Sequence, residues 1–380
     1  MKKNFADILN DISVSDFSRM KKKVPEWSAF EGLSYPSGLS MEQCSSSVTA
    51  LYKSRLCQQI APHPTVADLT GGLGVDSWAF SQIAGKVLYN EMNTQLFEAV
   101  RSNFGVMGIS NVIFSNCEIV PGCIQALLGN DFKPDIIYID PARRSSTGKK
   151  VFLIEDCSPD VLTLKEELFE AAPTLLIKLS PMADITMVLK RLGPEVRELH
   201  CVGADGECKE LLVVLQKGWS GATRIIAGGF SFLPEEESVA AASYCPDSKT
   251  LGAMPLLFEP SSTLLKTGAF KLLCERFPLL KLGRHSQLYA ARDIIPALDG
   301  LGKWFRIEDC LPFDKRNVTE LGKRLGRCEV TARNIPISSE ELKRKMGTAS
   351  GGSAHIFAFS ADFTEEESTR LILLTSPSNT

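Results

Sequence analysis

The chain has 380 residues, of which 44% are hydrophobic and 23% charged, and this ordinary globular composition excludes disordered and fibrous proteins. Its 42 Lys and Arg residues against 45 Asp and Glu residues give a formal charge of −3, which excludes a basic field over the whole chain that could hold nucleic acid. We expect a soluble, cytoplasmic protein of two or three domains, because no stretch approaches the ~20 apolar residues of a membrane span and the first residues lack the apolar core of a signal peptide.

The eleven cysteines and four histidines form no metal-binding pattern. The cysteines include no C-x-x-C pair, and the histidines are isolated from one another along the chain. We therefore expect no metal site, and we interpret the cysteines as reduced thiols, most of them buried.

Residues 1–50 are polar and of mixed charge, and we expect them to form an N-terminal helical arm. Three serines, Ser45, Ser46 and Ser47, precede apolar residues at helical spacing. This order is typical of a capped helix start.

Between residues 65 and 216, short apolar runs alternate with segments of helical periodicity, which is typical of βαβ units. The expected strands are 65–69, 86–89, 112–115, 135–139, 174–179, 196–202 and 211–216. Only residues 203–209 join the last two strands, too few for a crossover helix, so these strands should pair antiparallel. We predict an α/β domain over residues 51–218, with a doubly wound, seven-stranded Rossmann-like sheet whose last strand is antiparallel.

The rhythm of strands and helices breaks after residue 218, and we expect a connecting module over residues 219–303. A small α+β domain is predicted over residues 304–380, with helices near 318–325 and 338–346 and strands near 328–332 and 355–359. Residues 315–346 of this domain hold nine basic residues against four acidic ones. Such a surplus indicates either an RNA-binding surface or a solvated helix face, and the candidate RNA contacts are Arg333, Lys343, Arg344 and Lys345.

A turn rich in glycine follows the first predicted strand. Asp68 ends this strand, and Gly71, Gly72 and Gly74 allow the backbone to approach a nucleotide, although a simple tight turn can have the same composition. Glu91 ends the second predicted strand, 23 residues after Asp68, where a carboxylate can accept both ribose hydroxyls or be merely solvated. Since neither G-x-G-x-x-G nor G-K-[ST] occurs, this pattern favours S-adenosylmethionine over cofactors of hydride or phosphoryl transfer.

The fourth predicted strand ends in Asp140-Pro141-Ala142-Arg143-Arg144, the most specific segment of the chain. Open α/β sheets bind their ligands at this edge, and a carboxylate beside two guanidinium groups favours its charged form. We interpret the segment as a reaction centre, with a strand-end ion pair as the alternative.

Together these segments resemble the class I S-adenosylmethionine-dependent methyltransferases over about residues 65–216. More narrowly, the chain is similar to a bacterial family whose members carry a ferredoxin-like module and a C-terminal THUMP-like domain. The motifs that carry this resemblance are Gln43-Cys44-Ser45-Ser46, the turn at 68–76, the segment at 140–144, Glu155-Asp156-Cys157, Lys178-Leu179-Ser180-Pro181, Phe258-Glu259-Pro260, Lys266 and Arg333-Asn334-Ile335-Pro336. The resemblance places the ferredoxin-like module within 219–303 and the THUMP-like domain at 304–380.

The resemblance implies a cofactor site in which the glycine turn holds the methionine part, Glu91 holds the ribose, and the loop after the third strand lies near the adenine. The cofactor-binding residues expected from it are Asp68, Thr70, Gly71, Gly72, Gly74, Asp76, Glu91, Asn116 and Cys117.

The resemblance also implies a catalytic role for Asp140 and Pro141, which correspond to the D/N-P-P-Y motif of amino-methylating enzymes. Here Ala142 and Arg143 replace the second proline and the aromatic residue, so the segment is closer to the D-P-P-R or D-P-A-R motif of uridine C5-methyltransferases. Those enzymes need a cysteine after the fifth strand, where this chain has Ser180-Pro181. Cys157 is a possible substitute, against the simpler interpretation of a buried, inert thiol.

We thus expect Asp140 and Pro141 to hold the acceptor, with Arg143 and Lys178 as electrostatic partners. The function favoured by the sequence is methyl transfer from S-adenosylmethionine to an RNA base, in tRNA or rRNA. Two alternatives stay open: an RNA-binding protein that keeps a cofactor pocket without turnover, and a small-molecule methyltransferase.

Overall fold

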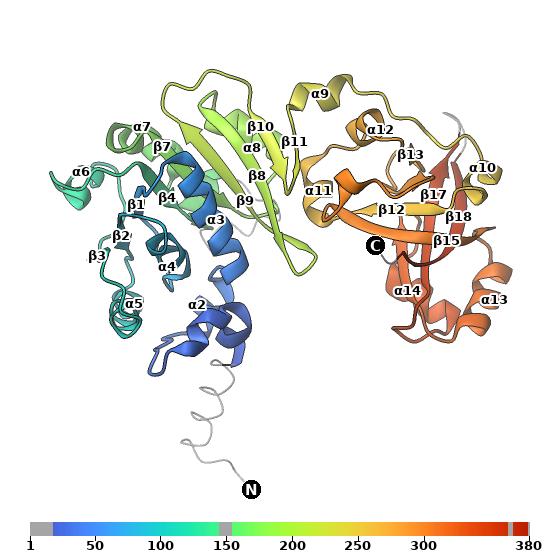
Figure 1. Ribbon diagram of the computed structural model, residues 1–380, viewed down its shortest axis with the longest axis horizontal. Helices are drawn as coiled ribbons and strands as arrows, with labels where there is room; N and C mark the ends of the chain where they lie inside the picture. Colours follow the sequence, from blue (N-terminus) through green and yellow to red (C-terminus); the bar gives the residue numbers. More distant parts are fainter. Residues whose placement is uncertain (1–17, 144–153, 364–367, 379–380) are drawn as a thin grey trace, which may run out of the picture. The chain divides into compact units, whose positions relative to one another are not determined.

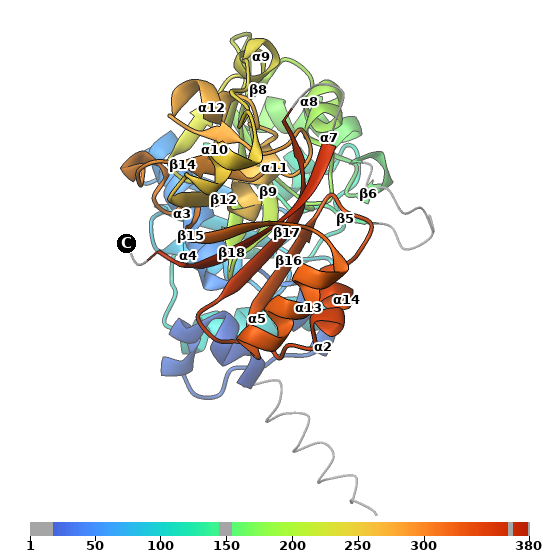
Figure 2. The ribbon, with the colours of Figure 1, turned by 90° about the vertical axis from the view of Figure 1, so that its right-hand side faces the viewer.

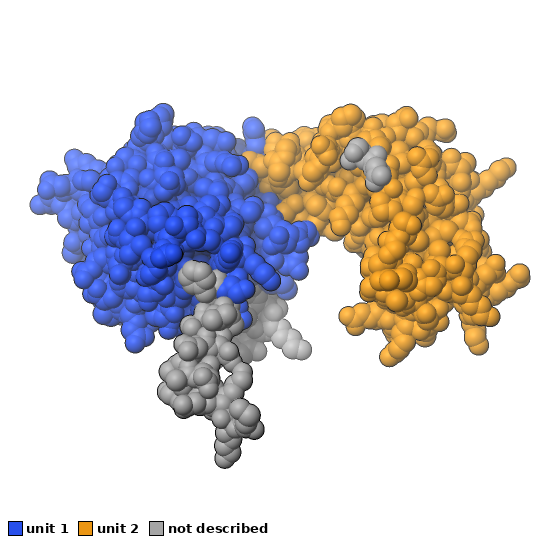
Figure 3. All heavy atoms as spheres, turned by 60° about the horizontal axis from the view of Figure 1, so that its bottom comes forward, with its two compact units in different colours: residues 1–224 blue, residues 225–380 orange. Residues whose placement is uncertain are grey.

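The computed structural model describes residues 18–143, 154–363 and 368–378, with the side chain of Arg143 outside the described part. The chain divides into two compact units, residues 1–224 and residues 225–380 (Figures 1 and 3). In the described ranges, no helix combines the length and the apolar character needed to cross a membrane.

Unit 1, residues 1–224, contains all seven strands expected from the sequence. They are β1 (Thr65–Asp68), β2 (Lys86–Asn90), β3 (Val112–Ser115), β4 (Ile136–Ile139), β7 (Thr174–Leu179), β8 (Val196–Ala204) and β9 (Glu207–Gln216). Within unit 1 their order in the sheet is β8-β9-β7-β4-β1-β2-β3. Two strands beyond the seven expected, β10 (Arg224–Ala227) and β11 (Phe230–Phe232), follow in the chain at the boundary between the units and pair with each other antiparallel.

The pairing within this sheet confirms the predicted fold class. Strand β1 pairs in parallel with both β2 and β4, while β9 pairs antiparallel with β7 and β8. The chain therefore leaves β1 toward one edge through β2 and β3, and then returns to fill the other side through β4 and β7. This reversal between β1 and β4 is the switch point at which open α/β sheets bind their ligands.

Helices cover the sheet because its central strands are apolar on both faces. All four residues of β4 are buried, as is typical of a parallel strand between two helical layers. Leu56 of helix α3 (Ser47–Ile60) and Phe80 of helix α4 (Val75–Ser81) share a core with Val66 of β1 and Ile136 of β4. The helices of this unit are α2 (Gly38–Gln43), α3 (Ser47–Ile60), α4 (Val75–Ser81), α5 (Thr94–Val106), α6 (Ile124–Leu128), α7 (Val161–Ala171) and α8 (Ile185–Leu192).

The N-terminal arm packs firmly on unit 1 from residue 18 onward. Ser46 caps α3 by accepting a hydrogen bond from the backbone of Thr49, as the serine run predicted. Trp27, in the 3-10 turn η1 (Pro25–Ala29), is 2% exposed and makes an edge contact with Trp78 of α4. The arm is therefore part of the core beside the glycine turn.

Unit 2, residues 225–380, is built on a seven-stranded sheet of order β13-β14-β12-β15-β18-β17-β16 (Figure 2). Its strands are β12 (Leu256–Pro260), β13 (Leu280–Lys281), β14 (Tyr289–Ala291), β15 (Gly302–Pro312), β16 (Glu329–Arg333), β17 (His355–Asp362) and β18 (Ser368–Pro377). Its helices are α9 (Pro234–Val239), α10 (Ser248–Gly252), α11 (Ser262–Thr267), α12 (Leu272–Arg276), the 3-10 turn η3 (Pro296–Leu298), α13 (Lys315–Leu325) and α14 (Ser339–Met346).

One sheet spans both C-terminal modules expected from the sequence. Strand β12 pairs antiparallel with β15, which in turn pairs antiparallel with β18. The four elements predicted near the C-terminus match α13, β16, α14 and β17, and both of these helices pack their apolar residues on one core. The domain boundaries at 218 and 303 stay predictions.

Candidate active site

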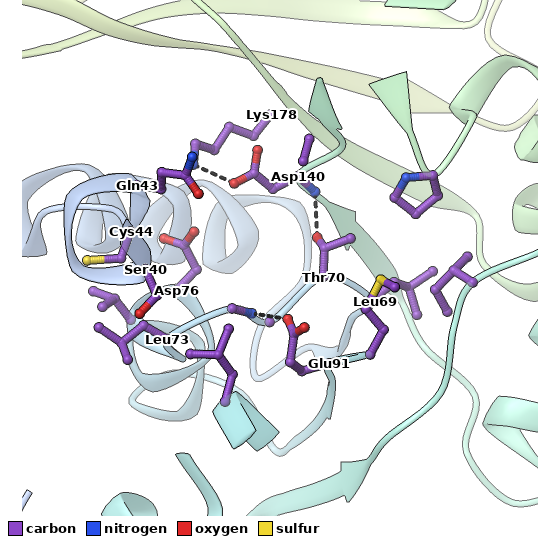
Figure 4. Close-up of a pocket in the computed structure, with 18 of the residues that line it drawn as sticks. Ser40, Gln43, Cys44, Leu69, Thr70, Leu73, Asp76, Glu91, Asp140 and Lys178 are labelled. Carbon is purple, nitrogen blue, oxygen red and sulfur yellow. Dashed lines mark hydrogen bonds and ion pairs between the residues drawn. The ribbon is translucent and has the colours of Figure 1, made fainter. Parts of the chain in front are cut away.

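A cavity of about 310 Å³ lies at the switch point of the large sheet (Figure 4). Its wall comes from the segments that follow β1, β2, β3 and β4, from the end of β7 and from helix α2. Among the expected site residues, those that line it are Thr70, Gly71, Gly72, Asp76, Glu91, Cys117, Asp140 and Lys178. The structure thus brings together eight residues that lie between positions 70 and 178 of the chain.

The glycine turn fits closely against its neighbours. A Cβ atom on Gly71 would collide with the ring of Tyr89, and one on Gly74 would lie 2.7 Å from Cγ1 of Val100. Gly74 also has a φ of 79° and caps the start of α4, a conformation that favours glycine. Packing therefore requires glycine at 71 and 74, while Gly72 faces the cavity.

Asp68 is fully buried and lies outside the cavity wall. Its carboxyl group accepts hydrogen bonds from the Ser77 hydroxyl (2.5 Å) and from the backbone of Thr70 (3.2 Å). Burial raises the pKa of Asp68 to about 8, although both hydrogen bonds act in the opposite direction. Asp68 thus stabilises the turn by linking the backbone of Thr70 to Ser77 of α4.

Glu91 lines the cavity and is held by two backbone groups. One of its oxygens accepts from Gly72 N at 2.9 Å, and the other accepts from Asn93 N at 2.7 Å. A carboxylate has about four acceptor positions, so Glu91 keeps two for a ligand.

The loop after β3 is fixed to the loop after β1 by a residue that the sequence did not suggest. The side-chain amide of Asn90, which is 1% exposed, donates to the carbonyl oxygens of Leu69 and Cys117. Asn116 contacts Thr94 and the backbone of Glu91, and it lies outside the cavity wall. Asn90 therefore sets the spacing between the two loops that flank Glu91.

Asp140 and Lys178 form an ion pair at the cavity, with 2.6 Å between Oδ2 and Nζ. Asp140 is also fixed through its backbone N–H, which donates to the Thr70 hydroxyl at 2.7 Å. Burial lowers the pKa of Lys178, but the carboxylates of Asp140, Asp76 and Glu210 outweigh this effect and raise it above its ordinary value. Lys178 is therefore a permanent cation at neutral pH.

A second set of charged side chains lies behind the Asp140–Lys178 pair, and two of its members, Lys53 and Glu210, were missed by the sequence interpretation. Nζ of Lys53 is 2.7 Å from Oε1 of Glu210 and 3.1 Å from Oδ1 of Asp76, and the Lys53 side chain is fully buried. The hydroxyls of Ser45 and Tyr138 donate to the other oxygen of Asp76. Burial alone raises the pKa of Asp76, but the ammonium groups of Lys53 and Lys178 outweigh it and lower the pKa below its ordinary value.

The segment after Asp140 folds back as strand β5 (Ala142–Arg143), which pairs antiparallel with β6 (Cys157–Ser158). The side chain of Arg143 and all of Arg144 lie outside the described residues, so their expected role stays a prediction. Pro141 is buried and Cys157 is 0% exposed, and neither lines the cavity. A nucleophilic role for Cys157 has no support from this position. In the described ranges, no group of three or more His, Cys, Asp and Glu side chains is placed to hold a metal.

The predicted RNA contacts lie in unit 2, and three of the four contact acidic residues. Arg333 pairs with Glu259 at 2.5 Å, Lys345 with Glu341 at 3.1 Å, and Lys343 lies 3.9 Å from Glu329. Arg344 is exposed. Helix α13 carries four more exposed cations that pair with no carboxylate of the described chain: Lys315, Arg316, Lys323 and Arg324.

Two family models match unit 2: a ferredoxin-like domain over residues 256–298 and a THUMP domain-like model over residues 302–376. A candidate methyltransferase from Porphyromonas gingivalis W83 is 32% identical, with a TM-score of 0.83, and the match covers 97% of this chain and 89% of that one. No curated protein matches the chain.

Two more distant solved structures match parts of the chain. A candidate methyltransferase from Streptococcus mutans in complex with SAH is 17% identical over 43% of this chain and 95% of its own, with a TM-score of 0.32. A candidate RNA methyltransferase from Pyrococcus horikoshii is 16% identical over 53% of this chain and 98% of its own, with a TM-score of 0.36.

Proposed function

Because the chain belongs to the bacterial family of class I S-adenosylmethionine-dependent methyltransferases with a ferredoxin-like module and a C-terminal THUMP-like domain, we propose that it transfers a methyl group from S-adenosylmethionine to RNA. The observation that carries the proposal is the meeting of a glycine turn, Glu91 and the Asp140–Lys178 pair around one cavity. S-adenosylmethionine would supply an electrophilic methyl group there.

The residues of the cavity fit this cofactor. Its volume of about 310 Å³ lies within the usual range for small-molecule sites, and Gly72 leaves the turn open on the cavity side. Glu91 has acceptor positions for two ribose hydroxyls, while Cys117 and Ile119 line the wall beyond it. Asp140 and Lys178 would hold the acceptor in line with the methyl group, because catalysis of such a displacement depends mainly on positioning.

Labelled methyl groups provide the test of this function. The purified chain is incubated with methyl-labelled S-adenosylmethionine and total RNA from a strain that lacks the protein. We expect label in RNA that ribonuclease releases. Cofactor binding without label in any RNA would favour the alternative of a pocket without turnover, and label in small molecules alone would favour a small-molecule methyltransferase.

Glu91→Ala is expected to weaken the binding of S-adenosylhomocysteine by roughly ten- to a hundredfold. The loss of charge-assisted hydrogen bonds to the ribose corresponds to about 1.5–3 kcal/mol. Titration calorimetry measures the affinity, and Glu98→Ala is a matched control, because Glu98 is an exposed glutamate of α5 that lies outside the cavity wall. Equal affinities of Glu91→Ala and wild type would contradict the assignment.

The exposed cations of α13 are expected to contribute to RNA affinity. Changing Lys315, Arg316, Lys323 and Arg324 to Gln should weaken binding of a structured RNA and flatten its salt dependence, by about one logarithmic unit of slope for each phosphate that is no longer neutralised. Changing Lys343, Arg344 and Lys345 to Gln should have a smaller effect, since both lysines already lie near carboxylates. Filter binding over a salt series measures both. Unchanged affinity and slope in the α13 variant would mean that this helix face is only solvated.

A further inference from the structure

We infer that the methyl acceptor is a hydroxyl oxygen, the 2′-hydroxyl of an RNA ribose, in place of the base atom that the sequence suggested. This inference rests on the proposed function, since it assumes methyl transfer to RNA. It comes from a charged cluster in which two lysines alternate with three carboxylates. The members of the cluster are Lys53 on α3, Asp76 on α4, Asp140 after β4, Lys178 on β7 and Glu210 on β9.

Lys178 is the cation of this cluster that lines the cavity, together with Asp76 and Asp140 (Figure 4). Its side chain is only 14% exposed, so its charge acts in surroundings that screen it less than water does. An ammonium group has three N–H donors, and one of them is used by Asp140. The others can reach an acceptor held beside Asp140.

Lys53 acts from behind the cavity wall as a positioning residue. It donates to Ser45 Oγ at 3.0 Å and to Glu210 Oε1 at 2.7 Å, and it pairs with Asp76. Burying two carboxylates without this partner would be costly. Lys53 therefore compensates the buried carboxylates of Asp76 and Glu210, and these carboxylates in turn raise the pKa of Lys178.

The charge that develops during the reaction decides between acceptor atoms. A neutral nitrogen becomes positive as it takes the methyl group, and a fixed ammonium group beside it opposes that charge. A hydroxyl oxygen instead gains negative charge as it loses its proton, and a fixed ammonium group stabilises that charge. The position of Lys178 therefore favours an oxygen over a nitrogen.

The proposed step joins a methyl transfer from sulfur to oxygen with a proton transfer from the hydroxyl to Asp140. The oxygen–methyl bond forms as the methyl–sulfur bond breaks, and the electron pair of the broken bond stays on sulfur. The hydroxyl proton passes to the Asp140 carboxylate and from there to solvent. Lys178 keeps its own proton and donates a hydrogen bond to the oxygen throughout.

The wall of the cavity also suits a ribose better than a base. None of the described side chains that line it is aromatic. Proteins that recognise RNA bases usually stack them on an aromatic ring or a guanidinium plane. A ribose hydroxyl needs no stacking surface.

Alkaline hydrolysis of the labelled RNA tests this inference. Alkali cuts RNA through the 2′-hydroxyl, so a 2′-O-methylated ribose remains in an uncut dinucleotide, whereas a methylated base is released in a mononucleotide. We expect the label in dinucleotides. Label in mononucleotides would overturn the hydroxyl acceptor and leave the proposed function standing, while RNA without label would overturn the proposed function and this inference with it.

A variant of Lys178 tests the role of its charge. Lys178→Met should lower kcat by about 10²–10³-fold, as expected for the loss of one electrostatic stabiliser, while affinity for S-adenosylhomocysteine stays within a few fold and shows that the cavity is intact. Lys165→Met is the matched control, because Lys165 is a partly buried lysine paired with Glu195 at 3.2 Å and lies outside the cavity wall. Its turnover should equal that of the wild type. Normal turnover of Lys178→Met would overturn the inference.

The RNA itself offers a further control. Once the methylated nucleotide is mapped, an RNA with a single 2′-deoxynucleotide at that position should accept no methyl group, since it lacks only the hydroxyl. If the deoxy-substituted RNA is methylated as fast as the unmodified RNA, the inference is overturned as well.

Discussion

Replacing Asp140 by alanine is expected to abolish methyl transfer, with cofactor affinity within a few fold of the wild type. The Asp140 carboxylate, just after β4, lies 2.6 Å from the Lys178 ammonium group, while Glu91 lies on the other side of Thr70 (Figure 4). The loss of a group that positions or deprotonates an acceptor costs about 10²–10⁴ in rate. Turnover of labelled S-adenosylmethionine on the identified RNA measures the change.

Asp140→Asn is the second variant that this prediction needs. The amide keeps the shape of the side chain and can still accept a hydrogen bond from Lys178, but it cannot take a proton. We expect turnover as low as that of Asp140→Ala, with calorimetry showing that the cofactor still binds. A folded Asp140→Asn protein with wild-type turnover would contradict a role for the carboxylate as proton acceptor.

The second large effect concerns stability. Lys53→Met should lower the free energy of unfolding by about 3–5 kcal/mol, because Glu210 and Asp76 would stay buried without their cation. Adding Glu210→Gln should restore part of the loss, since it removes one of the two uncompensated charges. Urea denaturation followed by far-UV circular dichroism measures these differences.

Lys209 provides the matched control, because it lies on the same strand β9 and pairs with Glu207 at 2.6 Å, at the surface. Exposed ion pairs contribute little to stability, so Lys209→Met should unfold at the same urea concentration as the wild type. A Lys53→Met protein that also unfolds at that concentration would show that the buried cluster does not hold α3 to the sheet.

The sheet of unit 1 was predictable because each of its strands carries a local signal. Residues 112–115 and 174–179 were predicted with the bounds that β3 and β7 have in the structure, since each is a short apolar run between polar or turn segments. Glu91 and Asp140, which line the cavity, became candidates because they come at the end of such runs. Residues at the carboxyl ends of neighbouring parallel strands meet at one edge of the sheet. A position at the end of a predicted strand is therefore enough to assign a residue to the candidate site.

The charged cluster was not predictable in this way. Lys53 and Glu210 lie 157 residues apart, and nothing near either residue shows that the other is its partner. The sequence around Lys53 predicts that it lies on a polar face of α3, although its side chain is fully buried. Glu210 directly precedes five apolar residues of β9, and this position next to an apolar run was the one local signal.

In unit 2, the local surplus of basic residues does not by itself identify the cations that lack an acidic partner. The nine basic residues of 315–346 are one group in the sequence, but the structure separates them by their partners. Arg333 pairs with Glu259, which lies 74 residues away, while the exposed cations of α13 have no carboxylate partner among the described residues. A surplus of charge therefore shows where to look for an RNA surface but not which residues form it.

The central claim, that the cavity at the switch point is a site for S-adenosylmethionine, is tested most directly by titration calorimetry of the full chain. We predict that S-adenosylhomocysteine binds with one molecule per chain, and that NAD, which shares the adenosine part but needs a different phosphate-binding turn, gives no heat at the same concentration. Binding of NAD as tight as that of S-adenosylhomocysteine, or no heat with S-adenosylhomocysteine, would contradict the account.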